Sequence, residues 1–133
     1  MDNKHVINAK INSTKRKLIH FSKAVNTEIL KNRFIIRPAS HLAERVVERG
    51  LDIGDVSMVI KWFAYKIIAD NISGGDVACK FKEMIVVFEF FEASEKFNIP
   101  SIMIKTAYIH GNNSLRGMDK VFNISVKDFM EMA

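Results

Sequence analysis

The chain has 133 residues, of which 48% are hydrophobic and 26% charged, so it has the length of one domain and enough apolar residues for a core. This composition argues against a chain that is disordered throughout, and one cysteine excludes an intramolecular disulfide and a zinc site built of thiolates alone. The net charge of +5 is uneven, because residues 1–50 carry 11 Lys+Arg and 4 Asp+Glu, whereas residues 51–133 carry 9 and 11. Such a basic half is typical of a surface that faces phosphates or an acidic protein, or of ordinary solubilising charge.

The N-terminus and the apolar runs bear on where the protein works. The N-terminus is polar and lacks the apolar core of a secretory signal, and apolar runs such as residues 85–88 are far too short to cross a bilayer. We therefore expect a soluble cytoplasmic protein without membrane contact. Abundant asparagine, isoleucine and lysine with little proline indicate an AT-rich genome, which suggests a bacterial or phage-infected host cell.

The first segment predicts an arm followed by a helix. Residues 1–13 alternate weakly between polar and apolar, which fits a flexible arm or a short edge strand. Ser13 or Thr14 can cap a helix, because apolar residues then recur at helical spacing. These residues are Leu18, Phe21, Val25 and Ile29. The basic residues 15–17 would lie in the first turn, where the helix dipole disfavours cations. Either the helix begins elsewhere or these residues form a functional basic cluster.

A brief strand, or an extended entry, and then a second helix follow. Residues 34–36 form a short apolar run, and Pro38, which has no N–H to donate, is expected to end it. Ser40 is placed to cap a helix over residues 41–49. Gly50 then supplies the left-handed conformation that ends a helix.

The third helix is the best defined, and a change of period follows it. Asp52 is expected to cap this helix, with Asp55 in its first turn and its end near Ala69. After a Gly-rich turn the apolar period changes from 3.6 to 2, which predicts strands and a short C-terminal helix. The strands cover residues 77–82, 84–92, 101–109 and 121–126, and the helix covers residues 127–133. The sequence thus predicts one α+β domain over residues 1–133, with N-terminal helices packed on one face of an antiparallel sheet of about four strands.

His41, Arg45 and Arg49 recur every four residues, so they line one side of the predicted second helix. A row of one histidine and two guanidinium groups is suited to clamp phosphates, because guanidinium matches phosphate in a bidentate way. The alternative is a solvated helix face on which the arginines pair with nearby carboxylates. These are Glu44, Glu48 and Asp52.

The same segment resembles a known signature. Its residues run Ser40-His41-Leu42-Ala43-Glu44-Arg45, then Arg49-Gly50-Leu51-Asp52 and Asp55-Val56. They are similar to the pattern of a widespread family of small bacterial and phage proteins, which has Ser-His-Ala, an Arg four residues after the His, Arg-Gly-Ile, a capped helix and several antiparallel strands. The resemblance covers roughly residues 34–110, and the chain departs from it at Leu42 and in an extra helix over residues 14–32. That family is related to the RelE-type and colicin-type ribonuclease fold.

The resemblance implies contact with RNA and metal-independent RNA cleavage, which needs a base, an acid and cations for the developing phosphorane charge. On this interpretation His41 is the base or acid, Arg45 and Lys105 stabilise phosphate, and Tyr108 or His110 lies near a strand end. The plain alternatives are a loop position for His110, a half-buried strand position for Tyr108 and a solvent-facing position for Lys105.

A basic segment adds candidate nucleic-acid contacts: Lys15, Arg16, Lys17 and Lys23, together with Arg49. It could equally contact a membrane surface or a protein. No phosphate loop, dinucleotide motif or metal-ligand spacing occurs, so we expect no cofactor and no metal. The favoured hypothesis is a nucleic-acid-binding protein, with RNA preferred, that has a toxin-like ribonuclease fold. The alternative is a non-enzymatic phage or bacterial protein that binds an acidic host protein and inhibits a host enzyme or defence system. A homodimer is possible in either case.

Overall fold

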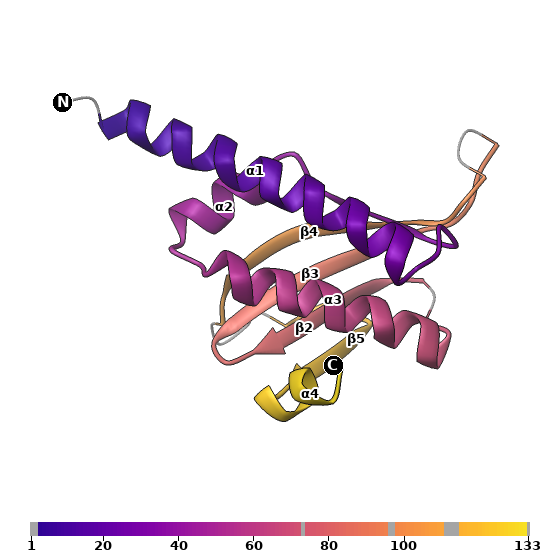
Figure 1. Cartoon of the computed structure of the whole chain (residues 1–133). Helices are drawn as coiled ribbons and strands as arrows, with labels where there is room; N and C mark the ends of the chain where they lie inside the picture. The colour runs from indigo at the N-terminus through magenta and orange to yellow at the C-terminus, as the bar shows by residue number, and fades with distance from the viewer. Residues whose placement is uncertain (1–2, 73, 96–97, 111–114, 133) are drawn as a thin grey trace.

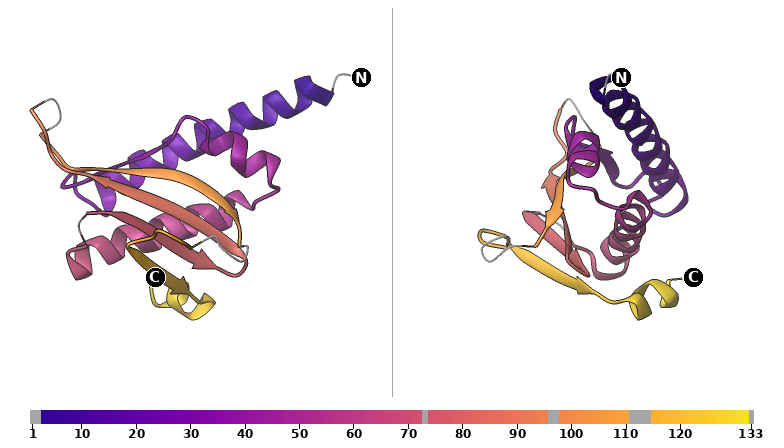
Figure 2. Two further views of the ribbon diagram at one scale, coloured as in Figure 1. Left: turned by 180° about the vertical axis from the view of Figure 1, so that it is seen from behind. Right: turned by 90° about the vertical axis from the view of Figure 1, so that its left-hand side faces the viewer.

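The structure is a computed structural model that describes residues 3–72, 74–95, 98–110 and 115–132. Within these residues one five-stranded sheet has the strand order β1-β4-β3-β2-β5. The elements are α1 (Asn3–Glu28), β1 (Ile35–Pro38), α2 (Leu42–Glu48), α3 (Ile53–Asp70), β2 (Asp76–Phe81), β3 (Met84–Phe91), β4 (Ser101–Ile109), β5 (Lys120–Ile124) and α4 (Val126–Glu131). Helices α1 and α3 lie side by side on one face of the sheet, with α2 at one end of that layer (Figures 1 and 2). The predicted α+β class and helix-on-sheet layering are confirmed.

Helix α1 begins earlier than predicted, because residues 3–13 are helical rather than an arm or a strand. Ile7 and Ile11 continue the stripe that carries Thr14 and Leu18, at spacings of three and four residues. Residues 3–10 are all exposed, and the helix projects beyond the sheet at its N-terminal end (Figure 1). Since Lys15 and its basic neighbours now lie in the middle of the helix, the expected conflict with the helix dipole does not arise.

The ends of α2 and α3 follow local rules, with one correction. His41, not Ser40, is the N-cap residue of α2, and its side chain makes no capping hydrogen bond. Gly50 adopts a φ of 61°, as predicted for the residue that ends this helix. Asp52 caps α3 by accepting a hydrogen bond from the Asp55 N–H at 3.0 Å.

The sheet contains the four strands predicted after α3, and β1 falls on the short apolar run at residues 34–36. The sheet is mixed rather than antiparallel as predicted. β2, β3 and β4 pair antiparallel, whereas β1 pairs parallel with β4 and β5 pairs parallel with β2. Parallel pairing requires a crossover connection, and α2 and α3 lie between β1 and the rest of the sheet in the chain. The last strand ends at Ile124, because Ser125 forms a capping box with Asp128 and begins α4.

The core lies between the helices and the sheet. Phe63 of α3 is fully buried, with its ring centroid 4.3 Å from that of Phe88 and 6.0 Å from that of Phe90. Cys79 is fully buried in β2, and burial raises the pKa of its thiol. A smaller apolar cluster occupies the opposite face of the sheet, where Tyr108 packs with Ile85 and Val87.

Candidate active site

The site predicted on α2 lies beside a free stretch of the edge of β4. β1 pairs with β4 only as far as Ile104, whose carbonyl accepts the hydrogen bond of the Ala39 N–H at 3.0 Å. Beyond that point no described strand pairs with this edge, and Arg49 occupies it. Its Nη1 donates to the Ala107 carbonyl oxygen at 2.6 Å and lies 3.4 Å from Thr106 Oγ1. Helix α2 therefore runs alongside β4 with the side of Arg49 turned toward the strand.

The three residues of the row have different surroundings. The His41 side chain is 71% exposed, and its Nδ1 lies 3.5 Å from Glu44 Oε2. Arg45 Nη1 lies 3.1 Å from Glu48 Oε2, so this arginine makes the helix-face ion pair that the alternative interpretation anticipated. Arg49 instead reaches across 58 residues of sequence to the main chain of β4. The row thus begins in solvent at His41 and ends against the sheet, about 12 Å further along the helix axis.

A β-bulge places Lys105 and Thr106 near this edge. Val87 is paired with Thr106, but the next residue, Phe88, is paired with Ile104, so Lys105 is the extra residue in β4. Lys105 Nζ lies 3.6 Å from Glu89 Oε2 on the face opposite the helices. Bulges commonly re-aim a side chain next to a functional site, and this one puts two polar residues in succession on the open face.

Tyr108 lies on the same open face, where burial and the charge of Arg49 both affect the pKa of its phenol. Partial burial raises the pKa of its phenol, and the nearby Arg49 guanidinium opposes this by lowering it. Tyr108 directly follows Ala107, whose carbonyl oxygen accepts the hydrogen bond of Arg49, so the phenol is the titratable strand group next to that contact.

His110 lies further along the chain and is not brought to the row. Its N–H donates to the Glu83 carbonyl oxygen at 2.6 Å, at the turn between β2 and β3. Its Nδ1 is buried and makes no hydrogen bond within the described part of the chain. His110 is five positions after Lys105, which corresponds to about 16 Å of extended chain. Residues 111–114 of the predicted loop lie outside the described residues.

The basic residues of α1 divide into two groups. Lys15 and Lys23 line a groove between α1 and β1, whereas Arg16 and Lys17 are exposed and do not line it. The described residues contain no group of three or more His, Cys, Asp or Glu that could hold a metal ion. None of the described helices is long and apolar enough to cross a membrane.

Comparison with known proteins places this geometry in a recognised fold. No family model and no curated protein matches the chain. Among solved structures, the solution structure of the phage T4 endoribonuclease RegB matches with a TM-score of 0.59, over 84% of this chain and 91% of that one. The two sequences are 16% identical. The chain shares the fold of that endoribonuclease. The relation to a ribonuclease fold that the signature implied is thus confirmed at the level of the fold.

The sequence analysis did not predict the roles of two residues of the site, Glu44 and Thr106. Glu44 was considered only as a partner of the arginines, although its position three residues after His41 is the usual spacing of a helical side-chain pair. Thr106 gave no sequence signal, because its position beside Arg49 depends on the bulge and on a contact between distant segments.

Replacing Arg49 by glutamine is expected to raise the pKa of Tyr108 further, because the cation that stabilises its phenolate is removed. The chain has two tyrosines, so the titration is best followed by tyrosinate absorbance in a Tyr65→Phe background. The raised pKa also implies stability that is present below the ordinary tyrosine pKa of about 10 and is lost as the pH rises through the folded value. An unchanged or lowered Tyr108 pKa in Arg49→Gln would show that the two groups do not interact.

Proposed function

We propose that the protein is a metal-independent endoribonuclease whose active site lies between the α2 row and the open edge of β4. One observation carries the proposal: the Arg49 guanidinium joins the row to β4 at the Ala107 carbonyl, next to Tyr108, in a fold shared with the endoribonuclease RegB. The arrangement combines the imidazole of His41, a side chain that serves as a general acid or base, with guanidinium groups suited to phosphate.

The reaction we propose is attack by a 2′-hydroxyl oxygen on the adjacent phosphorus. His41 takes the proton of the 2′-hydroxyl, the new O–P bond forms, and the bond from phosphorus to the 5′-oxygen breaks. The 5′-oxygen leaves with a proton from an acid, which gives a 2′,3′-cyclic phosphate and a 5′-hydroxyl. Glu44 beside Nδ1 would orient the imidazole so that Nε2 faces the substrate.

The remaining groups would stabilise charge and supply the acid. Arg45, Arg49 and Lys105 are suited to hold the phosphate oxygens as negative charge grows in the phosphorane. We assign the acid to Tyr108, because burial keeps its phenol protonated and Arg49 lies near enough to stabilise the phenolate. His110 would lie outside the centre, since it is further along the strand and bonded to the β2–β3 turn.

RNA binding is expected to weaken steeply with salt, because lysine and arginine contacts to phosphate release condensed counterions. Arg45→Gln and Lys105→Gln should each reduce the slope of log affinity against log salt by about one. Lys127→Gln is the matched control, because this lysine lies on α4 and its side chain is 83% exposed. Fluorescence anisotropy with a labelled structured RNA measures the slopes. Binding that is absent or insensitive to salt would count against the proposal.

A protein-binding role is the second candidate, and the N-terminal end of α1 favours it. Val6 is 59% exposed and Ile7 is 47% exposed on a helical segment that projects beyond the sheet (Figure 1). Exposed apolar side chains on such a helix suit a second copy of the chain or a host protein that carries acidic groups. Light scattering that finds a monomer at all concentrations, with no protein captured by the chain from host lysate, would remove this candidate.

A further inference from the structure

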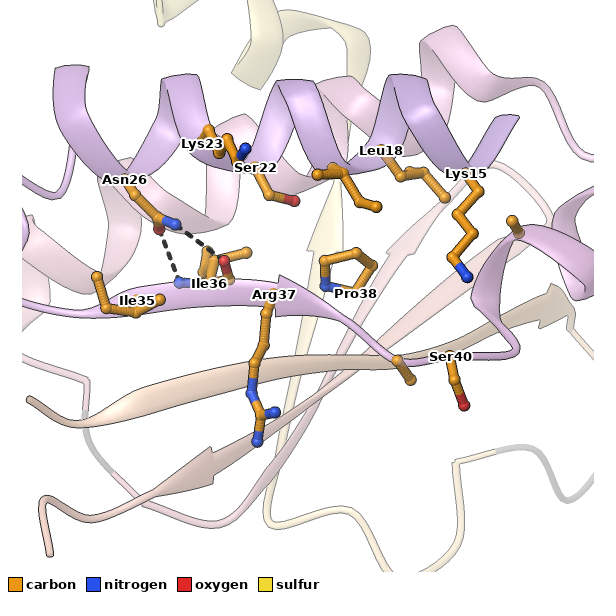
Figure 3. A pocket seen from close by; sticks show the side chains of 13 residues that line it. Lys15, Leu18, Ser22, Lys23, Asn26, Ile35, Ile36, Arg37, Pro38 and Ser40 are labelled. Atoms are coloured by element: carbon orange, nitrogen blue, oxygen red, sulfur yellow. Dashed lines mark hydrogen bonds between the residues drawn. The ribbon is translucent and has the colours of Figure 1, made fainter. Parts of the chain in front are cut away.

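We infer that the groove between α1 and β1 binds one base of the RNA, beside the nucleotide whose phosphate is cleaved. The inference rests on the proposed function and adds a recognition subsite to it. The groove has a volume of about 320 Å³, and its walls come from the middle of α1, from β1 and from the connection into α2 (Figure 3). Its size and its apolar walls suit a flat ring system.

The apolar walls come from two elements, α1 and β1, which pack in the core and are also joined by the hydrogen bonds of one side chain. Leu18 and Ile36 are buried on either side of the groove, and Pro38 and Ala43 extend it toward α2. The two elements are joined by Asn26, whose amide donates to the Ile36 carbonyl oxygen at 3.0 Å and accepts from the Ile36 N–H at 2.7 Å. Asn26 thereby holds the outer edge of β1, and its hydrogen bonds leave the groove walls fixed.

Ser22 is the polar group within this groove that has no evident structural role. Its residue is 3% exposed, and its Oγ is buried without a hydrogen-bond partner among the described residues. Figure 3 shows the hydroxyl pointing from α1 toward β1. A buried hydroxyl without a partner costs free energy, so it is expected to find one when a ligand is bound. A hydroxyl both donates and accepts, which suits the edge of a base.

The charges around the groove favour a ligand that carries phosphates. Two basic residues of α1, Lys15 and Lys23, line it, and no acidic residue does. Arg37 also belongs to the lining, but Figure 3 shows its side chain pointing away from α1. Lys15 and Lys23 are eight residues apart on α1, or about 12 Å along the helix axis. They can therefore contact the backbone on both sides of an inserted base. Figure 3 shows Lys15 reaching from α1 toward the β1–α2 connection.

Continuity with the candidate active site favours RNA over an acidic peptide. Ser40 and Ala43 line the groove, and they flank His41 in the chain. An RNA strand with one phosphate at the α2 row can therefore pass over the β1–α2 connection. Its neighbouring base can then lie between α1 and β1. An acidic peptide would also match the charge of the groove, but it would not account for the position of the groove beside the row that is proposed to bind phosphate.

The test compares the four short homopolymers of 2′-O-methyl RNA, which lack the attacking hydroxyl and so stay intact. Wild type is expected to prefer one base, and Ser22→Ala to reduce that preference by about two- to tenfold, the effect of one hydrogen bond. Ser22→Ala should fold normally, because the hydroxyl has no partner to lose. Ser13→Ala is the control, since Ser13 lies on the same helix outside the groove and should keep the wild-type preference.

Amide chemical shifts locate the contact independently of affinity. Bound homopolymer is expected to shift the Ser22 and Ile36 signals together with those of α2. Base preferences that are the same in wild type and Ser22→Ala, with no shift at these two amides, would overturn the inference, while RNA cleavage could still stand. Binding of an acidic peptide at these amides in place of RNA would also overturn it. Absence of any RNA binding would overturn both the inference and the proposed function.

Discussion

Replacing His41 by alanine is expected to lower the rate of RNA cleavage by about two to four orders of magnitude, the usual contribution of a general acid–base group. The side chain is 71% exposed and makes no capping hydrogen bond to α2. The fold should therefore be unaffected, so the loss would report on proton transfer rather than on stability. Single-turnover cleavage of a labelled RNA, beside thermal unfolding of the same samples, measures both quantities.

The matched control for this prediction is His20→Ala. His20 is an exposed histidine of α1 that lies outside the α2 row and outside the lining of the groove. Its variant should cleave at the wild-type rate. Equal rates for His41→Ala and wild type would remove His41 from the chemistry, whereas equal losses in both variants would indicate an effect that does not depend on the α2 row.

Replacing Asn26 by alanine is expected to lower the free energy of unfolding by about 3 kcal/mol. The change removes two hydrogen bonds to Ile36 and leaves its N–H and carbonyl without a side-chain partner in a buried position. Each buried group that loses its partner costs about 1–3 kcal/mol. Urea unfolding monitored by circular dichroism measures the change, because this contact joins α1 to the edge of the sheet.

Thr27→Ala provides the control at the next position. Thr27 is exposed, and its hydroxyl bonds only to carbonyls of its own helix, those of Lys23 and Ala24. Its replacement should change the free energy of unfolding by no more than about 0.5 kcal/mol. If Asn26→Ala were no more costly than Thr27→Ala, the side chain of Asn26 would not be what fastens β1 to α1.

Local patterns predicted those elements whose signals lie within a few residues. The cap at Asp52, the left-handed Gly50 and the alternation of the strands are of this kind, and the structure contains them. The same reasoning missed the first half of α1, because Val6 and Ile7 look like part of an alternation until the four-residue step from Ile7 to Ile11 is taken as helical. Local patterns also could not predict the strand pairing, since nothing local shows that β1 lies parallel to β4.

In the candidate site, too, local spacing predicted some features, whereas others depend on tertiary contacts. Helical periodicity predicted His41, Arg45 and Arg49 along one helix, and the structure has Arg45 within α2, with His41 and Arg49 as its N-cap and C-cap residues. Periodicity could not show that Arg49 leaves the helix face to bind the Ala107 carbonyl, because a contact over 58 residues depends on tertiary structure. For the same reason the orphan hydroxyl of Ser22 cannot be recognised in a polar stretch of helix before β1 is packed against it.

The most direct test of the proposed function is cleavage of a labelled structured RNA by the purified wild-type chain in excess chelator. We predict cleavage that persists under chelation and gives products with a 2′,3′-cyclic phosphate and a 5′-hydroxyl. RNA that stays intact while bound to the chain, or cleavage that stops when metal ions are removed, would contradict a metal-independent endoribonuclease.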